Sequence, residues 1–245
     1  MNKLAYKTME IQFLSTLFLA TTIMHGVHST VFTIKNNCPY NIAPATLTGS
    51  GASVTTGFEL APHASKTINM PAPWSGRVWA RFQCSNDGGK FSCNSGDCGS
   101  GHVECNGAGA IPPATLAEFT LSDASGKDFY DVSLVDGFNL PISVVPEGGC
   151  PTTNCPTDIN AKCPPEIAVK DRSGGTIGCK SACLAFQKPE YCCTGDHNRP
   201  ETCPPTNYSK FFKNLCPKAY SYAYDDRSST FTCNTGRNYV ITFCP

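Results

Sequence analysis

Sixteen cysteines are the feature that most constrains how this chain can fold. Their number is even and all of them follow residue 29, so in an oxidising compartment they predict eight disulfides. Zinc binding is the competing use of cysteine, but spacings such as Cys150 to Cys155 and Cys179 to Cys183 never give paired C-x-x-C knuckles. We therefore expect a cross-linked fold with no metal and no other cofactor.

The first 29 residues have the layout of a secretory signal peptide. Two lysines precede an apolar block at residues 13–24, which is too short to span a bilayer. Val27 and Ser29 are small enough for the positions three and one before a signal-peptidase cut, so we expect the mature chain to begin at Thr30. A buried N-terminal helix is the alternative, but no capping residue starts the segment and a strand-like stretch follows it directly.

The charge balance argues against two classes of partner. The chain has 19 Lys and Arg against 19 Asp and Glu, and loss of the leader, with two lysines and one glutamate, changes the net charge from zero to −1. This balance gives no electrostatic footprint for nucleic acid and no basic attraction to a membrane surface. We expect a secreted monomer without nucleic-acid partners.

Strand patterns dominate both ends of the chain. The β-branched or aromatic runs bounded by turn residues are 31–35, 77–82, 116–121, 129–135 and 239–243. Short strands with frequent turns are typical of a β-sandwich or barrel. Within 116–121, alternation places Glu118 on the same strand face as Leu116 and Thr120, where a charge needs a physical reason.

Two stretches depart from the strand pattern. Between Cys84 and Cys105 the chain is Gly-rich and holds four cysteines in 22 residues, which predicts a small disulfide-held lobe. Between Cys155 and Cys216 clean alternation is absent, which predicts a loop-rich, stapled subdomain.

One short amphipathic helix is predicted inside this subdomain. Its apolar side, which we expect to be core, consists of Tyr208, Phe211, Phe212 and Leu215, with Pro217 as a stop. Asn207 begins an Asn-Tyr-Ser sequon at the start of this helix, so it is a candidate glycosylation site.

The run from Gly89 to Cys105, GKFSCNSGDCGSGHVEC, resembles the signature of the thaumatin family. Ser95 stands where threonine is usual, but serine keeps the hydroxyl. Other stretches agree from end to end: FTIKNNCP from Phe32, PPATLAEF from Pro112, DVSLVDGFN from Asp131, YCC from Tyr191, CPKAYSY from Cys216 and STFTC from Ser229. The resemblance therefore covers the whole mature chain.

This resemblance implies a mostly β fold, a thaumatin-like flattened β-sandwich of about ten strands with two disulfide-rich insertions, one bearing short helices. We expect the sandwich in residues 30–82, 113–155 and 217–245, the small lobe in 83–112 and the helical and loop domain in 156–216. The disulfide pairs that the resemblance implies are Cys38 with Cys244, Cys84 with Cys93, Cys98 with Cys105, Cys150 with Cys233, Cys155 with Cys216, Cys163 with Cys179, Cys183 with Cys192 and Cys193 with Cys203.

The resemblance also implies an acidic cleft between the sheet domain and the disulfide-rich domain. The positions that match its lining are Arg77, Glu118, Asp131, Asp136 and Asp226, with the adjacent Asp225 as an alternative to Asp226. Opposed carboxylates are what glycoside hydrolysis requires, and we assign Glu118 as the acid and Asp131 as the base, with Arg77 holding one carboxylate ionised. The structural alternatives are turns at Asp136-Gly137 and Asp225-Asp226, and a salt bridge from Glu118 to Arg77 or another base.

The implied function is antifungal plant defence in the apoplast. The expected ligand is β-1,3-glucan or another cell-wall polysaccharide, a weak endo-β-1,3-glucanase activity is left open, and disruption of fungal membranes is a downstream effect. The resemblance is to fruit-type members, which include allergens, a property that the sequence does not establish.

Two further functions compete with catalysis. An acidic cleft can bind sugar without cutting it, as in a lectin, with aromatic side chains stacked on sugar faces. The aromatic candidates, most of which we expect in the core, are Phe119, Phe129, Phe138, Tyr220, Tyr222 and Tyr224. A non-catalytic protein-partner or enzyme-inhibitor role of a stable, stress-induced protein is the other alternative.

Overall fold

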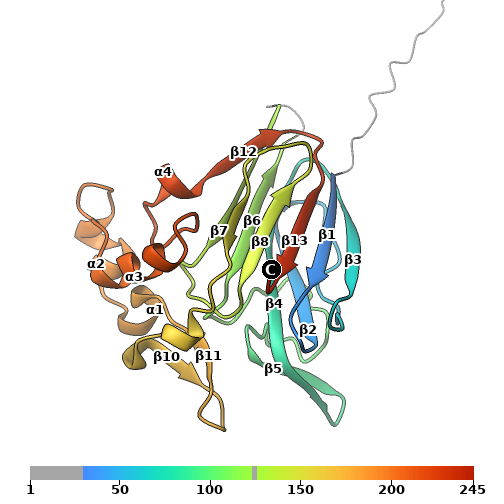
Figure 1. The fold of residues 1–245 in the computed structure, drawn as a ribbon, viewed down its shortest axis with the longest axis horizontal. Coiled ribbons are helices and arrows are strands. Elements are labelled where there is room, and N and C mark those ends of the chain that lie inside the picture. Colours follow the sequence, from blue (N-terminus) through green and yellow to red (C-terminus); the bar gives the residue numbers. More distant parts are fainter. Residues whose placement is uncertain (1–29, 123–125) are drawn as a thin grey trace, which may run out of the picture.

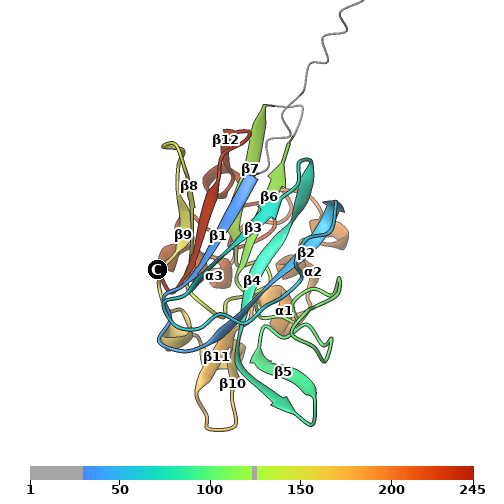
Figure 2. The same ribbon diagram turned by 90° about the vertical axis from the view of Figure 1, so that its right-hand side faces the viewer.

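The computed structural model describes residues 30–122 and 126–245, and the expected leader at residues 1–29 lies outside this part of the chain. Two β-sheets lie face to face (Figure 1), and Figure 2 shows the same strands from the side. The first has five strands in the order β3-β1-β13-β8-β9, with β1 parallel to β13 and the other neighbours antiparallel. Its strands are β1 Thr30–Asn36, β3 Ser65–Met70, β8 Ile142–Pro146, β9 Thr153–Cys155 and β13 Tyr239–Phe243.

The second sheet has six strands, all paired antiparallel. Its order is β12-β7-β6-β4-β2, and β5 pairs with the end of β4. The strands are β2 Ile42–Gly51, β4 Trp74–Asp87, β5 Lys90–Ser95, β6 Leu116–Leu121, β7 Lys127–Ser133 and β12 Phe231–Asn234. The mostly β sandwich is therefore confirmed, with five and six strands in its two sheets where about ten strands were expected in all.

Aromatic side chains fill the space between the two sheets. Phe32 of β1 is fully buried, and its ring centroid lies 4.4 Å from that of Phe119 of β6 and 5.7 Å from that of Tyr239 of β13. Successive side chains of a strand point to opposite faces, so the inward position of Phe119 turns Glu118 and Thr120 to the outer face of the second sheet.

The Gly-rich lobe covers one part of that outer face. Trp79 of β4 is buried beneath it and donates a hydrogen bond from Nε1 to the carbonyl of Gly96 at 2.9 Å. Arg81 is also fully buried, and its Nη2 donates to the carbonyl of Val103 at 2.6 Å. Arg77, two residues before Trp79 on the same face, lies beyond this cover with 39% of its side chain exposed. The uncovered part of the sheet is where the acidic residues lie.

The part of the chain between β9 and β12 carries the helices, at the left of Figure 1. Its elements are η1 Asn160–Lys162, η2 Pro165–Ile167, β10 Ala168–Lys170, β11 Thr176–Cys179, α1 Ala182–Phe186, α2 Pro189–Cys192, η3 Gly195–His197, α3 Asn207–Leu215 and α4 Asp226–Ser229. Within residues 30–122 and 126–245, no helix combines the length and apolar character needed to cross a bilayer.

Helix α3 is the helix predicted from the spacing of its aromatic residues. Thr206 caps it, because its hydroxyl accepts from the Ser209 amide at 3.3 Å while the Ser209 hydroxyl accepts from the Thr206 amide at 2.8 Å. Phe212 is 1% exposed and packs in the main core, as predicted. Asn207 is exposed at the start of the helix, and its glycosylation stays a prediction.

Eight disulfides join the cysteines in the pairs that the family resemblance implied. Cys38 and Cys244, which are 206 residues apart, fasten the segment after β1 to the residue after β13. Cys150 with Cys233 and Cys155 with Cys216 close the other long loops, with separations of 83 and 61 residues. The remaining five bridges have separations of 7 to 16 residues and staple the lobe and the helical region locally.

Candidate functional site

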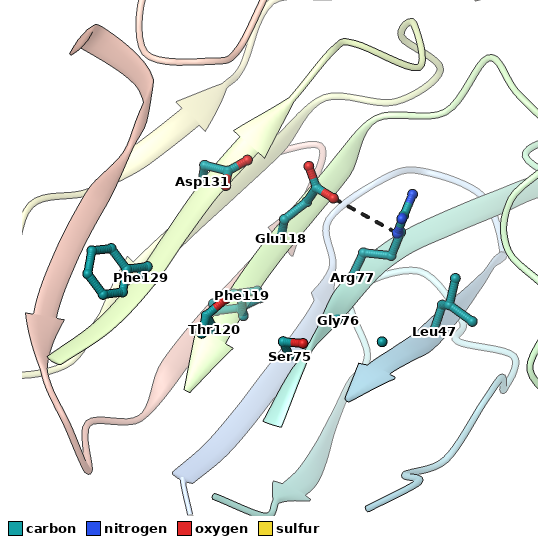
Figure 3. A pocket seen from close by; sticks show the side chains of 10 residues that line it. Leu47, Ser75, Gly76, Arg77, Glu118, Phe119, Thr120, Phe129 and Asp131 are labelled. Atoms are coloured by element: carbon teal, nitrogen blue, oxygen red, sulfur yellow. Dashed lines mark ion pairs between the residues drawn. The ribbon is translucent and has the colours of Figure 1, made fainter. Parts of the chain in front are cut away.

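Three charged residues form a row across three adjacent strands of the second sheet. Arg77 of β4 is paired in register with Glu118 of β6, and Glu118 is paired with Asp131 of β7. Directly opposed residues on one face have Cβ atoms about 5 Å apart, so each side chain of the row meets the next. Figure 3 shows the three side chains side by side on the floor of a pocket. The sheet register thus brings together residues that are distant in sequence.

Arg77 forms ion pairs with two of the predicted acids. Its Nε lies 3.9 Å from Glu118 Oε1, and its Nη1 lies 3.7 Å from Asp136 Oδ2. These side chains are 37 to 42% exposed, so water screens both pairs and they add little to stability. Asp136 also lies in a turn, in which the Gly137 amide donates to the Leu134 carbonyl at 2.9 Å. Asp136 therefore belongs to a turn and also lies beside Arg77, so the turn and the cleft position are compatible.

Asp131 is the most perturbed acid of the site. Burial is the main cause that raises the pKa of its carboxyl to about 8, and the charges of Glu118 and Asp226 contribute to the same rise. Its Oδ1 is buried and has no hydrogen-bond partner among the described residues. A buried oxygen without a partner disfavours the carboxylate form, so Asp131 holds a proton at neutral pH.

Glu118 differs from Asp131 because a cation lies opposite it. Burial raises the pKa of Glu118, and Asp136 adds to this, but Arg77 and the Ser133 hydroxyl lower it. No cation is among the causes that act on Asp131. These differences favour Asp131 as the acid and Glu118 as the base, which is the reverse of the acid and base assignment expected from the sequence. The reason is the strand order, which places Arg77 on the strand next to Glu118 and two strands away from Asp131, with β6 between them.

Of the two adjacent aspartates, Asp226 is the one that acts on the site. Asp225 is bound by Lys213 at 2.7 Å and by the hydroxyl of Ser221 at 2.8 Å, so its role is structural. Asp226 accepts a hydrogen bond from the Tyr220 hydroxyl at 2.8 Å, and its charge is one of the causes that raise the pKa of Asp131.

The row lies in the middle of an extended groove. A cavity of about 370 Å³ and a neighbouring one of about 340 Å³ share Arg77, Glu118 and Asp131 in their walls. The first is completed by Leu47, Gly49, Ser75, Gly76, Phe119, Thr120 and Phe129, and the second by Leu116, Ser133, Val135, Asp136, Tyr220 and Ala223. The charged row is therefore accessible from both ends of the groove.

Phe129 is the aromatic side chain best placed to meet a ligand. It stands two residues before Asp131 on the same face of β7, is 43% exposed, and lies at one end of the pocket in Figure 3. Phe119 and Phe138 are core residues with 3% and 0% exposure. Tyr220 lines the second cavity, whereas Tyr222 and Tyr224 are in the wall of neither.

Sequence reasoning missed several uncharged wall residues. Thr120 and Ser133 carry a usable signal, because each is two residues from Glu118 or Asp131 on a strand and shares its face. Ser75 carries the same signal, because it is two residues from Arg77 on β4, whereas Leu47 carries none, since only the β2–β4 pairing brings it to the groove. Among residues 30–122 and 126–245, no group of three or more His, Cys, Asp or Glu has a geometry that could hold a metal.

Comparison with known proteins identifies relatives along almost the whole chain. The thaumatin family matches residues 36–245. "Thaumatin-like protein 1" of Pyrus pyrifolia is 60% identical over 226 residues, covering 90% of this chain and 93% of the relative. "Glucan endo-1,3-beta-glucosidase" of Prunus avium is 57% identical over 237 residues, covering 94% and 97%. "Pathogenesis-related protein 5" of Arabidopsis thaliana is 52% identical over 240 residues, covering 96% and 98%.

A solved structure shares the fold at low identity. It is a laminaripentaose-producing β-1,3-glucanase in complex with laminaritetraose, which matches with a TM-score of 0.65 and 12% identity over 89% of this chain and 99% of that one. At this identity the likeness concerns the fold alone.

Proposed function

This chain belongs to the thaumatin family of plant defence proteins, and from that premise we propose that it is secreted and that its acidic groove binds β-1,3-glucan chains of fungal cell walls. The observation that carries the proposal is the row of Arg77, Glu118 and Asp131 in the middle of a groove that continues on both sides. A relative at 57% identity bears the name of an endo-1,3-β-glucosidase, which supports the choice of ligand.

The groove offers the groups that sugar recognition needs. Carboxylates of Glu118 and Asp136 accept hydrogen bonds from sugar hydroxyls, and the protonated Asp131 donates one. The exposed ring of Phe129 presents an apolar face on which a pyranose can stack, as aromatic rings commonly do with flat apolar surfaces. Because both cavities share the charged row, a glucan chain would cross it with sugar units on either side.

The same groove supports a weak endo-glucanase activity. Asp131, which holds a proton at neutral pH, would donate it to the glycosidic oxygen as the bond to the leaving sugar breaks. Glu118, whose pKa Arg77 lowers against the effect of burial, would take a proton from water or attack the anomeric carbon itself. Cleavage would occur inside a chain, since the pair lies at the middle of the groove.

One experiment separates binding from catalysis. The purified mature protein is passed over insoluble β-1,3-glucan, and retained protein and released reducing sugar are both measured. Glu118→Gln and Asp131→Asn are compared with Asp196→Asn, which changes an exposed aspartate of η3 that lines neither cavity of the groove.

The proposal predicts that the glucan retains the wild type and Asp196→Asn. Where the wild type releases reducing sugar, this release should fall by about 10²-fold or more in both groove variants, since a general acid or base contributes about 10²–10⁴-fold. Retention without any release keeps the binding function and rejects the enzyme. Absence of both retention and release overturns the proposal and leaves a protein partner as the better hypothesis.

A further inference from the structure

Lys213 of α3 lies outside the groove, yet its ammonium is within bonding distance of five groups. It lies 2.7 Å from Asp225 Oδ2 and donates to the carbonyls of Pro217 at 3.2 Å and Ala219 at 2.7 Å. It also lies 3.0 Å from the Ser228 hydroxyl and 2.9 Å from the Ser229 hydroxyl. Its side chain is only 24% exposed. All five partners belong to residues 217–229, the segment that follows α3.

That segment forms one wall of the groove. Tyr220 and Ala223 line the second cavity, and Asp226 binds the Tyr220 hydroxyl at 2.8 Å. The main chain of Tyr220 is attached to β7 independently, since its amide donates to the Val132 carbonyl at 2.8 Å. The part that bears Asp226 is the four-residue helix α4, which has too few turns to be stable without tertiary contacts.

We propose that Lys213 is a positioning residue that holds the 217–229 segment, and with it Asp226, against the acidic groove. Its ammonium binds both ends of the segment. It contacts carbonyls at the start and the side chains of Asp225, Ser228 and Ser229 at the end. Lys213 thereby fixes the separation of the two ends of the segment and the orientation of α4.

The same contacts of Lys213 also determine which of the two adjacent aspartates acts on the groove. Lys213 pairs with Asp225, so of the two adjacent aspartates only Asp226 is left to act electrostatically on the groove. The ionisable groups around Asp131 are Glu118, Arg77, Asp136, Tyr220 and Asp226. Of these, Asp226 alone is carried by α4, so its displacement would move the titration of Asp131 downward while the others stay in place.

The test compares Lys213→Met with Lys210→Met, which changes an exposed lysine one turn earlier on α3. The side-chain titration of Asp131 is followed by carbon-13 NMR in the absence of any glucan. We expect the Asp131 midpoint to fall by about one pH unit at most in Lys213→Met, because the charge of Asp226 is one of the causes that raise this pKa, and to stay unchanged in Lys210→Met. Lys213→Arg, which keeps a cation toward Asp225, should recover part of the shift.

An unchanged Asp131 midpoint in a folded Lys213→Met protein overturns the inference. If Lys213→Met does not fold, Ser228→Ala decides instead, because Ser228 is exposed and links both Lys213 and Asp225, at 3.0 and 3.1 Å. A smaller shift in the same direction supports the inference, and no shift contradicts it. Since the titration uses no glucan, its outcome is separate from that of the proposed function.

Discussion

Glu118 of β6 and Asp131 of β7 are direct cross-strand neighbours, and Arg77 of β4 is the cross-strand neighbour of Glu118 on its other side. Antiparallel register on a rigid sheet, not a flexible loop, therefore sets the distance between the two acids. The arginine lies next to one acid only, which gives two carboxyls of similar intrinsic acidity different proton affinities.

Asp131 should make the stability of the protein fall as the pH rises. Its pKa is about 8 in the folded state and has the ordinary value of 3.8 when unfolded, so between these limits the native state holds a proton that the unfolded state has lost. Its contribution to stability is thus complete below about pH 4 and is lost as the pH rises through about 8. Urea unfolding at pH 4, 6 and 8 should show a decline that is weaker in Asp131→Asn and unchanged in Asp196→Asn. Equal slopes in all three proteins would contradict the raised pKa.

The longest disulfide loop should contribute most to stability. In the chain-entropy model, the bridge from Cys38 to Cys244, with a separation of 206, contributes about 5 kcal/mol, and that from Cys84 to Cys93, with a separation of 9, about 3 kcal/mol. Replacing both cysteines of the first pair by serine should abolish secretion, whereas the same change in the second pair should lower only the urea midpoint. Normal secretion of the first double variant would count against this account.

Phe129→Ala should weaken glucan retention without unfolding the protein. The ring is 43% exposed, so its loss leaves no internal cavity, but it removes an apolar contact worth about 1–2 kcal/mol, or roughly 5- to 30-fold in affinity. Val145→Ala is the matched control, because Val145 is 40% exposed on β8 of the other sheet. Affinity electrophoresis in gels containing soluble β-1,3-glucan measures the effect, and equal mobility of the two variants would exclude Phe129 from the binding surface.

Arg77→Met should raise the pKa of Glu118. The arginine is the main cause that lowers this pKa against the effect of burial, and its side chain is 39% exposed, so we expect an upward shift of about one pH unit at most. Arg172→Met, which changes an exposed arginine in the β10–β11 turn, should leave Glu118 unaffected. A titration of the Glu118 carboxyl by carbon-13 NMR checks both, and the idea fails if the two variants behave alike.

Much of the sandwich was predictable because its strands follow simple alternation. The run 116–121 coincides with β6, and 239–243 coincides with β13. The strand expected at 129–135 runs instead over Lys127–Ser133. Asp128 explains the earlier start, because this fully buried acid accepts from the Tyr239 hydroxyl at 3.0 Å and from the Ser122 amide at 3.1 Å, so a polar residue that suggests a turn lies inside the strand.

The candidate site was predictable in its members but not in its electrostatics. Alternation around Glu118 indicated an outward charge, and the family resemblance supplied the other positions. Which acid lies next to Arg77 depends on strand order, and whether Asp225 or Asp226 acts on the groove depends on Lys213, a residue of α3 that no local pattern connects to them. Both features depend on tertiary contacts, which the periodicity of the sequence does not predict.

The central claim, that Glu118 and Asp131 are neighbouring carboxyls with different proton affinities on the floor of a glucan-binding groove, is tested most directly by titrating both carboxyls by carbon-13 NMR with and without a β-1,3-linked glucose hexasaccharide. We predict that Asp131 titrates at about pH 8 and that the oligosaccharide perturbs both resonances. An Asp131 midpoint in the ordinary range for aspartate, together with resonances that do not respond to the oligosaccharide, would contradict the claim.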